Sequence, residues 1–220
     1  MTPPLAVDID GTLSRADRSI DARVCDVLRS WDAPVVVATG KALPYPIALA
    51  DYVGIPQRVI AENGGVVYVD DHLEFNGDAE AAMAVVEEYE ARGHDLGWGD
   101  VDLVNRWRET EVAVSRESPL EPLREVAADH GLQVVDTGFA YHVKTAEMSK
   151  GRGLETAADL LGYDPTDFVA VGDSENDVST FEVAGRSFAV ANADDSAKAA
   201  ADAVTEGSYA DGFLEAVDAV

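Results

Sequence analysis

The sequence predicts an α/β protein in which a parallel β-sheet core is interrupted by a small inserted α+β domain. Short apolar runs alternate with segments of helical periodicity near both ends of the chain, a pattern typical of βα units. Between residues 78 and 148 the pattern changes to a few helices and strands typical of an antiparallel sheet. We therefore expect a core made of residues 1–77 and 149–220 and an inserted domain at residues 78–148.

The first part of the core is expected to begin with a buried strand at Leu5–Asp8. The uninterrupted apolar run at Pro34–Ala38 predicts a second strand, since such runs are typical of parallel sheets. Pro44–Val53 predicts a helix with proline in its first turn, where the missing N–H costs little. The other elements expected here are a helix at Ile20–Trp31, a strand at Arg58–Ala61 and a hairpin of Val66–Val69 and His72–Phe75.

The inserted domain is expected to contain two helices, Ala79–Ala91 and Pro119–His130. Its expected strands are Leu103–Trp107, Glu111–Ser115, Leu132–Asp136 and Ala140–Lys144. On a strand at Leu103–Trp107 that continues to Arg108, Arg106 and Arg108 would share the face opposite Trp107, because side chains alternate between faces.

The alternation of strand and helix returns near Ser149 and continues to the end of the chain. The helices expected there are Met148–Leu161, Asn176–Ala184, Asp194–Ala201 and Gly212–Val220, and the strands are Phe168–Val171, Ser187–Val190 and Ala203–Val204.

The composition limits the class of protein. With 220 residues, of which 47% are hydrophobic, the chain is long enough to bury a sizeable core. It has no apolar run of the length that crosses a membrane and no signal segment at its start. Cys25 is the single cysteine, which excludes an intramolecular disulfide and a Cys-rich zinc site. These features predict a cytoplasmic protein with no membrane partner.

The charge is strongly acidic: 42 Asp and Glu against 16 Lys and Arg give a formal net charge of -26. The acids are dispersed along the chain, so its surface should repel nucleic acid, and we expect no nucleic-acid partner. At about 1 M salt the Debye length is roughly 3 Å, which screens most of the self-repulsion. The composition resembles that of proteins from salt-accumulating archaea, and we expect stability to rise with KCl concentration.

Polar residues follow three of the expected core strands. Asp8 and Asp10 end the first, Thr39 follows the second, and Asp173 follows a later one. Ligands bind at the carboxyl ends of parallel strands, so these residues should meet in one crevice. On an extended strand Asp8 and Asp10 would share a face, and two adjacent carboxylates require a cation, a shared proton or a chemical task. The alternative is an ordinary Asp-Gly turn.

Four motifs in this order resemble those of the haloacid dehalogenase-like superfamily of phosphohydrolases. They are Asp8-Ile9-Asp10-Gly11-Thr12, Thr39-Gly40, Lys150 in Ser149-Lys150-Gly151, and Gly172-Asp173-Ser174-Glu175-Asn176-Asp177. Asn63-Gly64-Gly65 and the position of the insertion are similar to the Cof-like sugar-phosphatase branch. The resemblance implies a Rossmann-like core and an inserted domain that covers the site.

The resemblance also implies a mechanism. Asp8 would be the nucleophile that forms an aspartyl phosphate, and Asp10 the general acid and base. Lys150 would neutralise charge on the phosphoryl oxygens. The substrate-binding residues it implies are Thr39, Gly40, Lys150 and Asn176. It gives no role to Lys41, which stands where arginine is often found.

The implied cofactor is Mg²⁺, which prefers oxygen ligands. The resemblance assigns it to Asp8, the backbone carbonyl of Asp10, Asp173 and Asp177. Asp177 would hold the cation or its water and orient Lys150; its other possible role is to cap the following helix.

The implied substrate is a small phosphorylated metabolite. The small inserted domain is most similar to those of archaeal members that hydrolyse 2-phosphoglycolate, a substrate with a carboxylate beside its phosphate. The candidate groups for that carboxylate are Arg106, Arg108, His142 and Lys144, unless they form a solvated face of the inserted sheet. A broad sugar-phosphate phosphatase, a phosphotransferase and a non-catalytic phosphate sensor are the alternatives, and either a monomer or a homodimer is expected.

Overall fold

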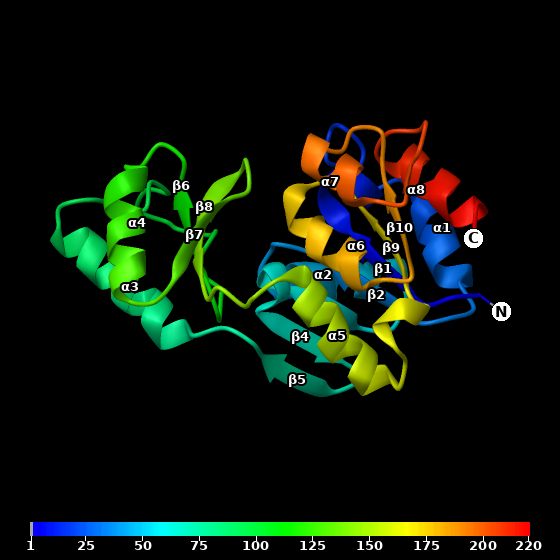
Figure 1. The fold of residues 1–220 in the computed structure, drawn as a ribbon, viewed down its shortest axis with the longest axis horizontal. Coiled ribbons are helices and arrows are strands. Elements are labelled where there is room, and N and C mark those ends of the chain that lie inside the picture. Colours follow the sequence, from blue (N-terminus) through cyan, green and yellow to red (C-terminus); the bar gives the residue numbers. More distant parts are fainter. Residues whose placement is uncertain (1) are drawn as a thin grey trace.

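The structure is a computed structural model that describes residues 2–220 and contains two β-sheets (Figure 1). The larger sheet has eight strands in the order β11-β10-β9-β1-β2-β3-β4-β5. The strands from β11 to β3 run parallel, and β4 and β5 add an antiparallel edge. This topology confirms the predicted α/β class. The strands are β1 (Leu5–Asp8), β2 (Val35–Ala38), β3 (Arg58–Ala61), β4 (Val66–Val69), β5 (His72–Phe75), β9 (Val169–Gly172), β10 (Arg186–Ala189) and β11 (Ala203–Val204).

Helices cover both faces of this sheet because its central strands are apolar on both sides. Leu5 and Val7 of β1 belong to an apolar cluster on one face, and Ala6 belongs to another on the opposite face. Three helices pack on the first cluster: α1 (Ala22–Ser30), α2 (Pro44–Val53) and α8 (Ala210–Asp218). The opposite face is covered by α5 (Lys150–Leu161), α6 (Val178–Val183) and α7 (Asp195–Ala200).

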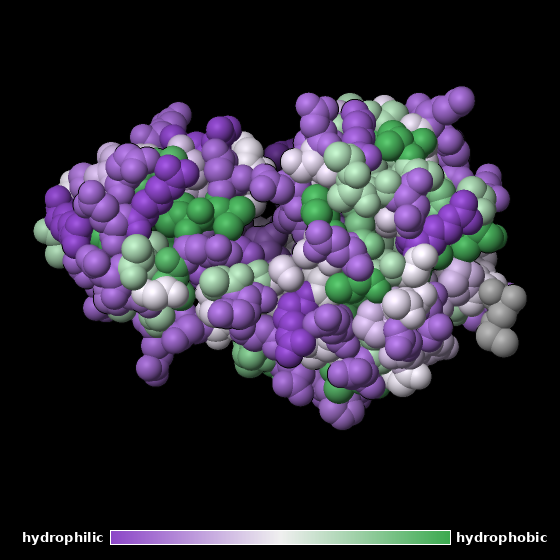
Figure 2. All heavy atoms as spheres, in the orientation of Figure 1, coloured by the Kyte–Doolittle hydropathy of each residue, from purple (hydrophilic) through white to green (hydrophobic). Residues whose placement is uncertain are grey.

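The smaller sheet is formed by residues between β5 and α5, in the segment predicted to be an inserted domain, and has three antiparallel strands in the order β6-β8-β7. Its helices pack on the sheet through a separate apolar cluster that includes Tyr89, Val126 and Val143. Figure 1 shows this sheet beside the larger one, and Figure 2 shows that the surface is hollowed between the two parts. The elements are α3 (Ala79–Ala91), β6 (Val112–Ser115), α4 (Leu120–Asp129), β7 (Gln133–Asp136) and β8 (Ala140–Lys144).

The predicted strand at Leu103–Trp107 is wrong, because these residues form consecutive turns. The side chain of Asp102 accepts hydrogen bonds from the two backbone N–H groups at positions 104 and 105, at 2.8 and 2.9 Å. The side chain of Asn105 exchanges two further bonds with the backbone of β6. A turn of this kind satisfies the backbone without a neighbouring strand. As a result Arg106 is exposed while the side chain of Arg108 is only 5% exposed, so the two do not share a face.

Side-chain caps set several of the remaining boundaries. Helix α1 begins at Ala22, after Ile20, because Asp21 accepts a hydrogen bond from the N–H of Arg23 at 2.9 Å and acts as its N-cap. A 3₁₀ turn at Glu175–Asp177 precedes α6. Among residues 2–220, no helix combines the length and the apolar character that crossing a membrane requires.

Candidate active site

The carboxyl ends of three central strands meet at one edge of the eight-stranded sheet. Asp8 is the last residue of β1, Thr39 follows β2, and Asp173 follows β9. Strand β1 lies between β2 and β9, so the three residues are neighbours in the sheet although they are far apart in the sequence. The structure therefore brings together the strand-end residues as the sequence predicts.

Lys150, the first residue of α5, reaches across this edge to two carboxylates. Its ammonium donates to Oδ1 of Asp8 and to Oδ1 of Asp177, each at 2.7 Å. The lysine side chain is completely buried. Burial alone lowers its pKa, but the charges of Asp177 and Asp8 outweigh burial and raise it. Lys150 is therefore a fixed cation at this site.

Asp8, Asp173, Asp177 and Lys150 form what we call the acidic centre. Burial, opposed by Lys150, raises the pKa of Asp8 to about 7. Burial and the charges of Asp8 and Asp177 raise the pKa of Asp173 to about 8. Three carboxylates share one ammonium here, so the centre carries excess negative charge.

The acidic centre fits a hard divalent cation. Oδ2 of Asp8 is buried and has no hydrogen-bond partner within residues 2–220. Asp8, Asp173 and Asp177 each offer an oxygen, and these oxygens lie within 4.8 Å of one another. Oxygen donors with uncompensated negative charge are what Mg²⁺ requires. Gly11 leaves the necessary space, because a Cβ there would lie 1.9 Å from Oδ2 of Asp173.

Asp10 lies beyond β1, in a short turn at Ile9–Leu13, and so does not continue the strand as the sequence suggests. The positive φ of Gly11, 87°, bends the chain at this point. Asp10 nevertheless faces the same cavity as Asp8, with its side chain 43% exposed. Lys41, for which no role was predicted, forms an ion pair with Oδ2 of Asp10 at 2.8 Å.

A cavity of about 290 Å³ lies between the acidic centre and the inserted domain. Thr39 and Gly40 line it from the core, where Oγ1 of Thr39 accepts a hydrogen bond from the N–H of Lys41 at 3.1 Å. Its lining residues are Asp8, Asp10, Arg18, Thr39, Gly40, Lys41, Asn63, Arg108, Thr137, Phe139, His142, Asp173, Ser174 and Asn176.

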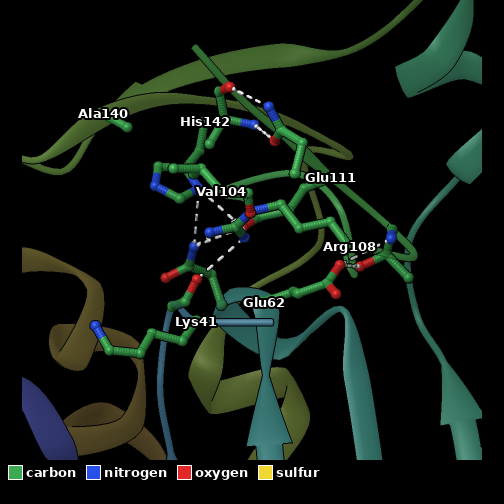
Figure 3. A network of polar contacts seen from close by, with 12 residues as sticks. Lys41, Glu62, Val104, Arg108, Glu111, Ala140 and His142 are labelled. Atoms are coloured by element: carbon green, nitrogen blue, oxygen red, sulfur yellow. Dashed lines mark hydrogen bonds and ion pairs between the residues drawn. The ribbon is translucent and has the colours of Figure 1, made fainter. Parts of the chain in front are cut away.

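The inserted domain contributes a second buried ionic group, which we call the Glu111 cluster: Arg108, Glu111 and His142. The Glu111 carboxylate accepts from Nη1 of Arg108 and from Nδ1 of His142, the latter at 2.8 Å. Burial raises the pKa of Glu111, but the charges and hydrogen bonds of His142 and Arg108 outweigh it and lower the pKa to about 2. Figure 3 shows the three side chains gathered above Glu62.

Glu62, which sequence reasoning missed, ties the core to the inserted domain. Its fully buried carboxylate accepts hydrogen bonds from the backbone N–H groups of Glu109 and Thr110 and from Oγ1 of Thr110, at 2.8–3.1 Å. Burial raises its pKa despite these bonds. The position of residues 108–111 is therefore set by a core side chain.

Asn63 links the Glu111 cluster to Asn176, in the 3₁₀ turn that precedes α6. Its Nδ2 donates to Oε2 of Glu111 at 3.2 Å, and its Oδ1 accepts from Nδ2 of Asn176 at 3.0 Å. Asn176, a predicted substrate-binding residue, is thus connected through one side chain to the inserted domain. The sequence signal for Asn63 is Asn63-Gly64-Gly65, whereas nothing distinguishes Glu62 or Glu111 among the 42 acidic residues.

Two of the candidate carboxylate-binding residues do not reach this cavity. Arg106 is exposed to solvent. Lys144 is buried, and its ammonium donates to the backbone oxygen of Met148. Burial lowers the pKa of Lys144, and the residue lines a neighbouring cavity of about 240 Å³ instead.

The fold and this arrangement of carboxylates and lysine agree with a family comparison. The family model of haloacid dehalogenase-like hydrolases matches residues 5–95 and 125–217 of this chain. The chain therefore belongs to the haloacid dehalogenase-like hydrolase family.

Close relatives carry a more specific name. A phosphoglycolate phosphatase from Natronomonas pharaonis is 63% identical over 220 residues, covering 99% of this chain and 97% of that protein. A phosphoglycolate phosphatase from Halobacterium salinarum is 66% identical over 218 residues, with the same coverage of 99% and 97%. A solved Thermoplasma acidophilum structure is 25% identical with a TM-score of 0.84, covering 100% of this chain and 98% of that one.

Proposed function

We propose that this chain is a Mg²⁺-dependent phosphatase that hydrolyses 2-phosphoglycolate to glycolate and phosphate. The observation that carries the proposal is Asp8, a buried carboxylate with one oxygen held by Lys150 and the other without a partner within residues 2–220. Asp10 lines the same cavity. The substrate is supported by the names of the relatives that are 63% and 66% identical to this chain.

The proposed reaction has two displacements at phosphorus. In the first, a carboxylate oxygen of Asp8 attacks phosphorus, an O–P bond forms, and the bond to the ester oxygen breaks. Asp10 donates a proton to that leaving oxygen, which departs as the hydroxyl of glycolate. In the second, Asp10 takes a proton from a water molecule that attacks the aspartyl phosphate, and phosphate leaves with Asp8 restored.

Four groups would bind the phosphoryl oxygens during both displacements. Lys150 neutralises their charge, Thr39 donates its hydroxyl, Gly40 its backbone N–H, and Asn176 its side-chain amide. The ion pair between Lys41 and Asp10 supports the proposal because it holds Asp10, the proposed general acid and base, at the cavity.

Mg²⁺ would be held by the carboxylates of Asp8 and Asp173 and by the backbone carbonyl of Asp10. Asp177 would act through a water molecule, since its oxygens already accept from Lys150 and from the N–H groups of residues 173 and 174. When bound, the cation offsets the repulsion between carboxylate and phosphate and polarises the transferring group.

We further propose that residues 78–148 act as a cap over a core formed by residues 1–77 and 149–220. The hydrogen bonds from Glu62 and Asn63 to residues 109–111 support this arrangement. Cytoplasmic location and a monomeric or homodimeric state stay predictions.

The test is an assay of the full-length chain with Mg²⁺ in molar KCl on a panel of phosphate monoesters. We expect 2-phosphoglycolate to give the highest kcat/KM. Turnover of no ester by the folded protein would overturn the phosphatase, and a tenfold or greater preference for a hexose phosphate would overturn the substrate but keep the reaction.

A further inference from the structure

The inserted domain presents two nitrogen atoms to the cavity that no described residue uses. Arg108 donates from Nε to the carbonyl of Val104 and from Nη1 to the carbonyl of Gly40, each at 3.1 Å, and Nη1 also contacts Glu111. Its Nη2 has no partner within residues 2–220. The guanidinium is therefore fixed on two edges and available on the third.

His142 is fixed in a similar way. Its Nδ1 faces the Glu111 carboxylate at 2.8 Å, and because a carboxylate only accepts, Nδ1 carries the hydrogen. Nε2 has no partner within residues 2–220, and the ring lines the cavity. Nε2 is therefore the nitrogen of His142 that a ligand in the cavity can reach, beside Arg108.

Glu111 holds both basic groups with a single carboxylate. Its carboxylate is completely buried and is shared by Arg108 and His142. Two basic side chains face one carboxylate here, which is the opposite of the acidic centre across the cavity. A second anionic group on a substrate would complete this balance, and a planar guanidinium suits a carboxylate.

We propose that Arg108 and His142 bind the carboxylate of a substrate whose phosphate lies at Asp8, and that Glu111 is the positioning residue for both. This deepens the proposed function and rests on it. The cavity of about 290 Å³ suits a small ester in which phosphate and carboxylate are close. Lys41 is paired with Asp10, which leaves Arg18 as the other cation along the cavity, on an exposed loop.

The test compares two substrates that differ in the carboxylate: 2-phosphoglycolate and 2-hydroxyethyl phosphate. The measured quantity is the ratio of their kcat/KM values, which does not depend on the fraction of active protein. In Arg108→Met we expect the ratio to fall on the order of 100-fold, and in His142→Asn about tenfold, because a buried charged hydrogen bond is lost. Arg106→Met, the exposed neighbour, should leave the ratio unchanged.

The positioning role of Glu111 has its own readout. In Glu111→Gln we expect KM for 2-phosphoglycolate to rise about tenfold with kcat nearly kept, and KM for 2-hydroxyethyl phosphate to stay unchanged. A purely structural role would change both substrates alike. If Arg108→Met does not fold, Arg108→Lys replaces it, with an expected intermediate fall in the ratio because an ammonium keeps the charge but not the planar group that Val104 and Gly40 fix in place.

The outcomes separate a failure of the proposed function from a failure of the proposed carboxylate site. If wild type hydrolyses neither ester, the proposed function fails. If wild type hydrolyses both equally well, or if Arg108→Met lowers both rates alike, the phosphatase remains and the carboxylate site is wrong. If only Arg18→Met lowers the ratio, the carboxylate lies on the core side instead and the proposal for Arg108 and His142 is overturned.

Discussion

The acidic centre and the Glu111 cluster are both buried and face one cavity, but their charge balance is opposite. In the acidic centre three carboxylates share Lys150, and the pKa values of Asp8 and Asp173 rise to about 7 and 8. In the Glu111 cluster one carboxylate has two basic partners, and its pKa falls to about 2. Burial raises the pKa at both sites, so the number of basic partners decides the sign.

This difference separates two kinds of buried charge. The acidic centre is incomplete by itself and becomes balanced with a cation, whereas Glu111 is already satisfied by its neighbours. Removing a carboxylate should therefore cost turnover without loss of stability at the first site, and should cost stability, with kcat nearly kept, at the second.

The largest effect is expected from Asp8→Asn. We expect turnover to fall roughly 10⁴-fold or more, since the nucleophile is lost. The free energy of unfolding should not fall, because the change removes negative charge from a centre with too much of it. Turnover and urea unfolding are the measurements, with Asp159→Asn on the exposed face of α5 as the matched control. Wild-type turnover by Asp8→Asn would rule out the covalent mechanism.

For Glu111→Gln we expect the free energy of unfolding to fall by about 3–5 kcal/mol, because Arg108 stays buried without its counterion. The pKa of Glu111 is lowered in the fold, so its stabilising contribution is complete above the reference value of 4.5 and is lost as pH falls toward about 2. Urea unfolding between these pH values measures both effects. Glu125→Gln, an exposed change, should cost less than about 0.5 kcal/mol; an equal cost for both variants would contradict the comparison.

In the acidic centre without Mg²⁺, stability should fall as pH rises, which is the opposite of the pH dependence expected from Glu111. The raised pKa values of Asp8 and Asp173 mean that their ionisation destabilises the metal-free fold. This destabilisation is absent below about pH 3.8 and complete above about pH 8. Mg²⁺ at 100 times its Kd stabilises by about 2.7 kcal/mol. We expect a larger rise in Tm with Mg²⁺, relative to EDTA, at pH 8 than at pH 6, and a smaller rise in Asp173→Asn. An undiminished rise in Asp173→Asn would show that the cation binds elsewhere.

The smallest effect concerns salt. Stability should rise with KCl because the net charge of -26 is screened at the surface. The buried clusters are screened much less, so the cost of Glu111→Gln should change by less than about 0.5 kcal/mol between low and molar KCl. Urea unfolding of both proteins at the two salt concentrations measures this; a cost that vanishes in molar KCl would mean that Glu111 is exposed to solvent.

Much of the core was predictable because its strands are continuous apolar runs whose ends carry polar residues. Asp8, Thr39 and Asp173 could be placed at one edge from topology alone, and the structure confirms their proximity. The roles of these residues stay proposals. The prediction of a strand at Leu103–Trp107 was wrong because the side chains of Asp102 and Asn105 form the hydrogen bonds that a neighbouring strand would form. The spacing of apolar residues does not reveal this preference.

The Glu111 cluster was only partly predictable. Arg108 and His142 were candidates because the substrate implied by resemblance needs a cation, but Arg106 and Lys144 were equally eligible. Only the fold separates them, by exposing Arg106 and occupying Lys144 with a backbone carbonyl. Glu111 had no signal, since its partners Arg108, His142 and Asn63 lie 3, 31 and 48 residues away along the chain.

The contacts from Glu62 bear on how this family could be re-engineered. Residues 108–111 belong to the inserted domain in sequence, but the carboxylate that fixes their backbone belongs to the core. A chimera that exchanged only residues 78–148 would import a new Arg108 and Glu111 without the anchors that aim them. Substrate preference should therefore transfer between relatives only when the residues at positions 62 and 63 are exchanged together with residues 78–148. The segment that determines specificity is thus larger than the inserted domain.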